Sequence, residues 1–194
     1  MKNRVIASAI VLVSALPLTS CIAVDDFGTY WSQAVPDRAI VGSWKQIQAT
    51  VDQTRAHGYG IGNITTFVQK GDAFEMTATE QDGKAVDRSM GNIKTLKIGN
   101  YDMIAFPAPN GMLDRYEIHG SAMNMCMAIG PAQVEWVEQH YPQATSVHKN
   151  HDEGEYLAID VLDKEAYDIL ASIPATDEYW DCSWKFVRVP TRAR

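Results

Sequence analysis

Apolar and polar residues alternate with a period of two along most of the chain after residue 40. This period is typical of strands that bury one face, because successive side chains of a strand point to opposite sides. Short breaks such as Lys70-Gly71-Asp72 and Gly99-Asn100 favour hairpins between antiparallel strands. The pattern predicts strands over residues 40–49, 63–69, 73–80, 86–97, 101–107, 114–119, 122–128, 156–161 and 180–188.

Two segments in the second half of the chain have helical periodicity instead. The first can begin at Pro131 and ends before Pro142, and the second can be capped by Asp163 and ends before Pro174. Their apolar stripes are Val134, Val137 and Tyr141 in the first, and Ala166, Ile169, Leu170 and Ile173 in the second. Sequential hairpins with one apolar face must pack against another layer or curl closed. We therefore expect a strand-dominated α+β fold, either an antiparallel β-barrel or a strongly curved sheet, with two helices in its second half.

The first 21 residues have the organisation of a secretory signal. Lys2 and Arg4 precede an apolar run over residues 5–18, which is too short for a comfortable membrane span, and Leu18-Thr19-Ser20-Cys21 closes it. The segment resembles the signal of bacterial lipoproteins, which is cleaved before a cysteine that receives a diacylglyceryl group and a further acyl chain such as palmitate. The alternative is an uncleaved signal anchor in which Cys21 is unmodified.

This resemblance implies a location and a division of the chain. Residues 1–20 would be removed, residues 21–38 would form the lipidated N-terminus and a tether, and residues 39–194 would form one domain. In the lipoproteins that the signal resembles, an aspartate after the cysteine favours the inner membrane. Ile22 stands there instead. We therefore expect lipid attachment to the outer membrane, facing the periplasm. Aromatic residues within 22–38 predict that part of the tether docks on the domain; they are Phe27, Tyr30 and Trp31.

Charge narrows the range of partners. The chain carries a formal net charge of −7, and loss of Lys2 and Arg4 with the signal makes it −9. An acidic surface repels phosphate backbones, so nucleic acid is not an expected partner, whereas a basic envelope protein is favoured. With Cys21 committed to lipid, Cys126 and Cys182 remain. An oxidising envelope permits a disulfide between them, and the alternative is that both pack separately as small apolar residues.

Gly42-Ser43-Trp44 opens the first predicted strand, and Arg188 stands at the end of the last one. In this arrangement the chain resembles the lipocalins, in which a Gly-x-Trp opens the first strand of an eight-stranded barrel. The resemblance implies that Trp44 plugs the closed end, that Arg188 packs over its ring, and that the barrel holds a small apolar ligand. Otherwise Trp44 is an ordinary core residue and Arg188 lies on the surface.

Met123, Met125 and Met127 share one face of a predicted strand. Thioethers are soft ligands that select Cu(I). Alternate side chains on a strand are, however, rooted about 6.6 to 7 Å apart, so three sulfurs on one strand converge poorly on one ion. Methionine also lines adaptable apolar pockets, and we interpret this face as core or pocket lining.

His148 and His151, with three acidic residues that follow, are the weak candidates for a metal site. Their segment has the composition of a solvated loop, and zinc sites usually draw ligands from more than one element. No nucleophile elbow, metalloprotease helix, phosphate loop or dinucleotide motif occurs in the sequence. We therefore expect neither catalysis nor a cofactor. The predicted function is non-enzymatic binding of a small apolar ligand; the alternative is an envelope interaction module, an inhibitor or assembly subunit, that offers its acidic surface to a basic partner.

Overall fold

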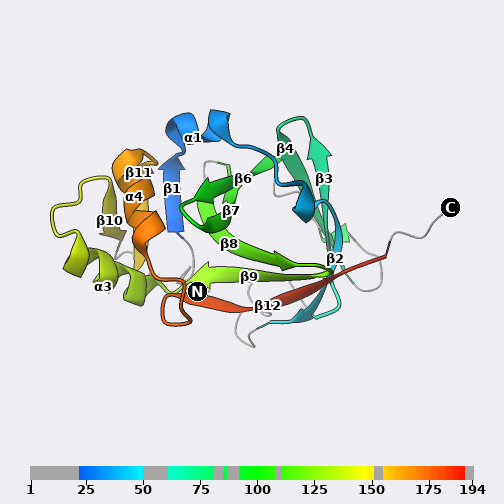
Figure 1. The fold of residues 1–194 in the computed structure, drawn as a ribbon. Coiled ribbons are helices and arrows are strands. Elements are labelled where there is room, and N and C mark those ends of the chain that lie inside the picture. Colours follow the sequence, from blue (N-terminus) through cyan, green and yellow to red (C-terminus); the bar gives the residue numbers. More distant parts are fainter. Residues whose placement is uncertain are drawn as a thin grey trace, which may run out of the picture.

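Eight antiparallel strands form a closed barrel in the computed structural model, which describes residues 22–49, 61–80, 85–86, 92–107, 111–150 and 155–190 (Figure 1). The strands are β2 (Gly42–Gln48), β3 (Ile64–Lys70), β4 (Ala73–Thr79), β6 (Asn92–Ile98), β7 (Tyr101–Phe106), β8 (Met112–His119), β9 (Ala122–Ala128) and β12 (Trp180–Arg188). Pairing of β8 with β9 closes the ring. The expected strand-dominated α+β barrel is thereby confirmed. The strand predicted over residues 86–97 is two strands, because a short β5 (Ala85–Val86) pairs with β4 before β6 begins.

The sheet also continues beyond the barrel. The first residues of β8 pair with β1 (Ile22–Asp26), which runs parallel to β11 (Tyr156–Val161), and β10 (Val147–Asn150) forms the outer edge. The expectation of a loop around His148 is therefore wrong for residues 147–150. A strand of four residues at a sheet edge has too short an alternation to be recognised in the sequence.

The expectation of a tether over residues 21–38 is wrong for the part that the structure describes. Residues 22–26 form β1, and α1 (Gly28–Gln33) and a 3-10 turn, η1 (Arg38–Ile40), follow. Ile22 and Val24 are completely buried. The sequence pattern did not predict this strand, because its parallel partner β11 lies more than 130 residues later in the chain. The expected docking of the aromatic residues is confirmed, since Phe27 is buried and the ring of Tyr30 stacks on Tyr167 at 5.2 Å.

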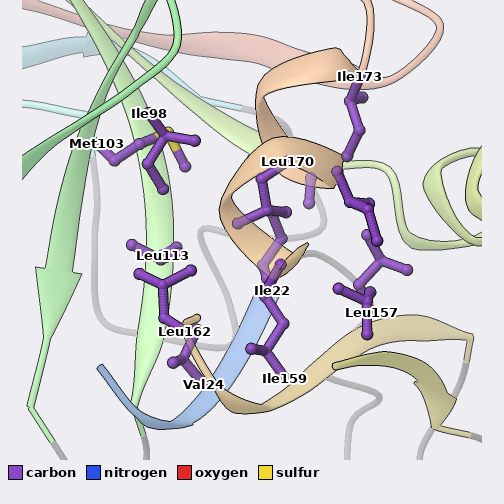
Figure 2. Close-up of a cluster of buried hydrophobic side chains, with 14 of the residues drawn as sticks. Ile22, Val24, Ile98, Met103, Leu113, Leu157, Ile159, Leu162, Leu170 and Ile173 are labelled. Atoms are coloured by element: carbon purple, nitrogen blue, oxygen red, sulfur yellow. The ribbon is translucent and has the colours of Figure 1, made fainter. Parts of the chain in front are cut away.

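Two helices lie beside the sheet extension, as the sequence predicts: α3 (Gly130–His140) and α4 (Lys164–Ser172) (Figure 1). Asp163 caps α4, because its Oδ1 accepts the Ala166 amide at 2.9 Å. Leu170 of α4 and Ile173 just after it belong to the same buried cluster as Ile22 of β1 and Ile159 of β11 (Figure 2). Within the described ranges, no helix has the length and apolarity needed to cross a bilayer.

The barrel wall separates two hydrophobic cores. On β7, Met103 belongs to the core beneath α4, whereas its neighbour Ile104 belongs to the core inside the barrel. On β8, Leu113 points to the first core and Tyr116 to the second. Strand alternation therefore tells which side chains face the barrel interior.

Candidate functional site

Trp44 and Arg188 lie together at the end of the barrel where β2 begins and β12 ends, which is the end that the resemblance predicts to be closed and which we call the closed end. The Arg188 Cζ lies 4.1 Å from the ring centroid of Trp44, a residue that is completely buried. The Arg188 guanidinium donates to the carbonyls of Val41 and Ala39, each at 2.6 Å, and the indole N–H of Trp44 donates to the Ile40 carbonyl at 2.7 Å. The predicted stacking of Arg188 over Trp44 is confirmed.

The closed end also holds a chain of satisfied polar groups. The Tyr116 hydroxyl donates to Asp37 Oδ2 at 2.7 Å, and the Asp37 amide donates to Thr95 Oγ1 at 2.8 Å. Burial, and then the hydrogen bond with Asp37, raise the pKa of Tyr116. Strand β2 begins at this end, and neighbouring strands of the barrel run in opposite directions. The hairpins β3–β4, β6–β7 and β8–β9 therefore turn at this end. Strands β2, β4 and β7 therefore end, and β3, β6 and β8 begin, at the opposite end of the barrel.

Apolar side chains line most of the interior. The three methionines of β9 point inward and are buried; Met125 lies opposite Tyr116 of β8 on one side and Trp184 of β12 on the other. Phe67, Phe74 and Phe186 belong to the same core. The interpretation of Met123, Met125 and Met127 as core or pocket lining fits this placement.

Asp114 interrupts this apolar lining. It lies on β8 between Met112 and Tyr116, opposite Ile104, and so points into the barrel. Only 7% of the residue is exposed, and its Oδ1 has no hydrogen-bond partner. Burial raises the pKa of Asp114 to about 7. An aspartate in this setting changes its protonation state near neutral pH, whereas an aspartate at the surface does so in acid.

Gln46 is the second unsatisfied polar side chain of the interior. It lies on β2 two residues beyond Trp44 and opposite Phe186, so it points to the same side as both. The residue is 1% exposed, and neither its amide oxygen nor its amide nitrogen has a partner. A buried polar group without a partner destabilises a fold by about 1 to 3 kcal/mol, which makes each such group a candidate for contact with a ligand.

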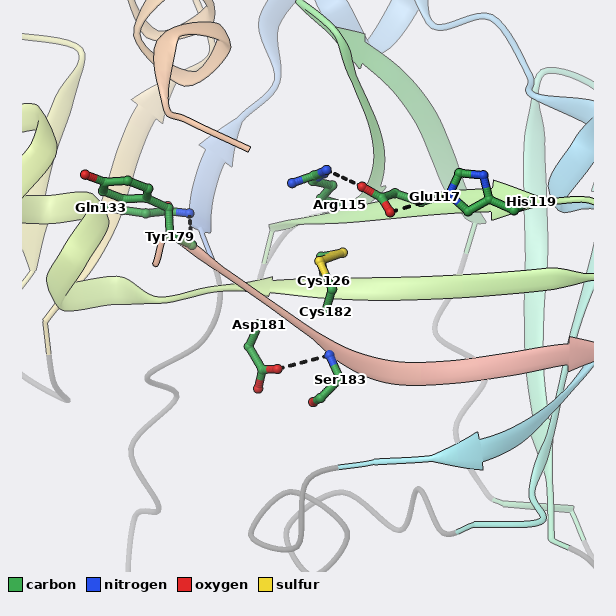
Figure 3. The surroundings of a disulfide bond; sticks show 9 residues. All are labelled: Arg115, Glu117, His119, Cys126, Gln133, Tyr179, Asp181, Cys182 and Ser183. Atoms are coloured by element: carbon green, nitrogen blue, oxygen red, sulfur yellow. Dashed lines mark hydrogen bonds and ion pairs between the residues drawn. A yellow bond between two sulfur atoms is a disulfide. The ribbon is translucent and has the colours of Figure 1, made fainter. Parts of the chain in front are cut away.

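The disulfide lies outside this interior. Cys126 and Cys182 are bonded, which joins β9 to β12 on the side of the core beneath α4 (Figure 3). Beside it, Arg115 forms an ion pair with Glu117, and its Cζ lies 4.9 Å from the Tyr101 ring centre. In the chain-entropy account, a bridge that spans 56 residues stabilises a fold by about 4 kcal/mol. We assign the bridge a structural role.

The histidine candidates do not form a site in the described part of the chain. His148 lies on β10, where its Nε2 is 3.8 Å from Asp160 Oδ1, and His151 lies outside the described residues. No group of three histidine, cysteine, aspartate or glutamate side chains with metal-binding geometry occurs among the residues described. Cys21 and residues 1–20 also fall outside them, so lipid attachment remains a prediction.

Asp114 and Gln46 were not among the site residues predicted from the sequence. A signal was nevertheless available, because both interrupt an otherwise apolar face: Asp114 precedes Tyr116 and Ile118 at intervals of two, and Gln46 follows Trp44. Comparison of the chain with protein-family models, curated proteins and solved structures finds no match in any of the three.

Proposed function

We propose that this protein binds a small, largely apolar molecule inside the barrel and carries out no chemistry on it. The observation that supports this most is the pair of buried, unpaired polar side chains, Asp114 and Gln46, on an otherwise apolar wall. Ligand sites in proteins have this composition, with a mostly apolar lining and a few polar groups that orient the ligand. A ligand that meets both side chains removes the penalty of leaving them unsatisfied.

The lining suits a guest that displaces side chains. Methionine has three rotatable bonds and repacks around irregular shapes, and Met125 and Met127 lie on the strand beside Asp114. The Gln46 amide offers both a donor and an acceptor. The ligand in this proposal therefore has one compact polar group and an apolar body.

We also propose the location that the signal implies: attachment to the outer membrane through lipid on Cys21, with the barrel on the periplasmic side. A ligand carrier at this position would take up its ligand from the periplasm or from the membrane surface. Nothing in the proposal requires a cofactor.

Methionine methyl NMR tests binding inside the barrel. The full chain, held in lipid nanodiscs and labelled with ¹³C in its methionine methyl groups, is titrated with hexanol, and assignments come from single Met→Leu variants. We expect saturable shifts of Met125 and Met127. Met103 is the internal control, because it lies on the other side of the barrel wall. Absence of saturable shifts at Met125 and Met127 with hexanol, hexylamine and hexanoic acid alike would overturn the proposal and leave the acidic interaction module as the leading account.

A further inference from the structure

The ionisable side chains of the barrel interior are acidic. Asp114 lies on the inward face of β8, two residues after that strand begins, and the carboxylate of Asp37 lies at the closed end, where Tyr116 donates to it. Lys97 has the inward position on β6, but it is exposed and paired with Asp102 at 2.8 Å. The Arg188 guanidinium is committed to the ring of Trp44 and to two backbone carbonyls. Among the residues described, no basic side chain offsets the charge of Asp114.

Aromatic residues share the interior of the barrel with Asp114. Tyr116 and Trp184 flank Met125 in register across three adjacent strands, and all three point inward. Asp114 is two residues from Tyr116 on the same face of β8, so the roots of the two side chains are about 6.6 to 7 Å apart. The faces of aromatic rings carry partial negative charge and attract organic cations. A carboxylate beside such rings selects positive charge.

We propose, resting on the binding function above, that the ligand is an organic amine whose ammonium group pairs with the Asp114 carboxylate while its apolar body packs on the β9 methionines. A buried carboxylate is stabilised when an opposite charge within hydrogen-bonding distance replaces water. An anionic ligand, such as a fatty acid, meets only like charge from Asp114 and Asp37.

The pairing of the amine with Asp114 makes the binding affinity depend on pH. Because burial raises the pKa of Asp114 to about 7, the carboxyl is protonated in acid and ionised at pH 8. The amine remains charged throughout this range. Binding below pH 7 must therefore expel the Asp114 proton, and the affinity for the amine falls about tenfold for each pH unit below 7.

Three ligands with one alkyl chain test the charge selection: hexylamine, hexanol and hexanoic acid. Each is titrated calorimetrically into the full chain in nanodiscs at pH 8, with empty nanodiscs as the blank. We expect hexylamine to bind at least tenfold more tightly than hexanol, and hexanoic acid to bind more weakly than either. Asp114→Asn should remove the advantage of the amine, so that the ratio of the affinities for hexylamine and hexanol falls from at least tenfold to about one. Asp160→Asn removes the same charge from an exposed position on β11 and should change neither affinity.

The outcomes separate the two proposals. Equal binding of hexylamine and hexanol, or an amine preference that survives Asp114→Asn, would overturn the amine inference while leaving a ligand-binding barrel. Failure of all three ligands to bind would overturn both. The pH profile of the unmodified protein provides a second measurement that needs no variant. An amine affinity that is constant from pH 5 to pH 8 contradicts the inference.

Discussion

Arg188 lies over the ring of Trp44, and the two residues also face each other in register across β12 and β2. The stacked pair therefore joins the last strand of the barrel to the first. The pairing of β12 with β2 is one of the contacts that complete the ring, and it brings together two residues that are 144 positions apart in the sequence. The plug is thus an element of closure as well as of packing.

Truncation of this plug should destabilise the barrel strongly. We expect Trp44→Ala to lower the free energy of unfolding by about 3 to 5 kcal/mol, since it empties a fully buried site. Arg188→Ala leaves two carbonyls without their donor and should lower it by about 1 to 3 kcal/mol. Urea unfolding measures both, with Lys45→Ala on the exposed face of β2 as control. A loss below about 1 kcal/mol for Trp44→Ala would contradict the role of a plug.

Asp114 should make the stability of the protein fall as the pH rises. Its pKa is about 7 in the fold and about 3.9 in the unfolded chain, so the folded state binds the extra proton between these values. The Asp114 contribution is therefore most favourable below pH 4, weakens from pH 4 to pH 7, and is constant above pH 7. The full difference is about 4 kcal/mol.

Asp114→Asn isolates this contribution, because it keeps the shape and removes the titration. Relative to the unmodified protein, the variant should gain stability between pH 4 and pH 8. Urea unfolding at both pH values measures the gain. An identical pH dependence for the two proteins would show that Asp114 keeps an ordinary pKa in the fold.

Gly111 tests whether β1 belongs to the sheet. A Cβ at this position would lie 1.9 Å from the Val24 carbonyl oxygen of β1, and the Val24 amide donates to Gly111 O at 3.0 Å. Gly111→Ala should therefore separate β1 from β8 and destabilise the protein. Gly71→Ala is the control, because that glycine has a positive φ but no atom near its Cβ position, and such a change alone is worth about 1 kcal/mol.

A loss for Gly111→Ala no larger than that for Gly71→Ala would favour a loosely attached N-terminal segment. Hydrogen exchange at the amides of residues 22–26 gives the same answer by a second route. We expect them to be protected in the unmodified protein and to exchange rapidly in the Gly111→Ala variant.

Cys21 decides the location. We expect Cys21→Ser to accumulate as a precursor without acyl groups, because the cysteine sulfur is the atom to which the lipid would be attached. Mass spectrometry of membrane-extracted protein measures the acyl mass directly. If the unmodified protein carries no acyl chain, the lipoprotein hypothesis is wrong, whatever the barrel binds.

The elements that the sequence predicted correctly are those with local signals. Barrel strands such as β3 and β4 alternate between buried and more exposed residues, and α4 has its own cap at Asp163. By contrast, β1 is stabilised by a parallel partner far along the chain, and its pattern alone is too short to identify it. Trp44 and Arg188 were predicted as a pair because Trp44 stands in a Gly-x-Trp at the first predicted strand and Arg188 at the end of the last, which resembles the lipocalin pattern. Asp114 was missed, because an aspartate on a strand is ordinarily on the exposed face and only the closed barrel reverses that expectation.

Strand β1 begins at Ile22, the residue after the cysteine that the signal marks for lipid. Ile22 is completely buried and lies opposite Leu113. Under the lipoprotein hypothesis the domain would therefore rest directly on the bilayer, because no residue separates the lipidated cysteine from the first residue of the hydrogen-bonded sheet.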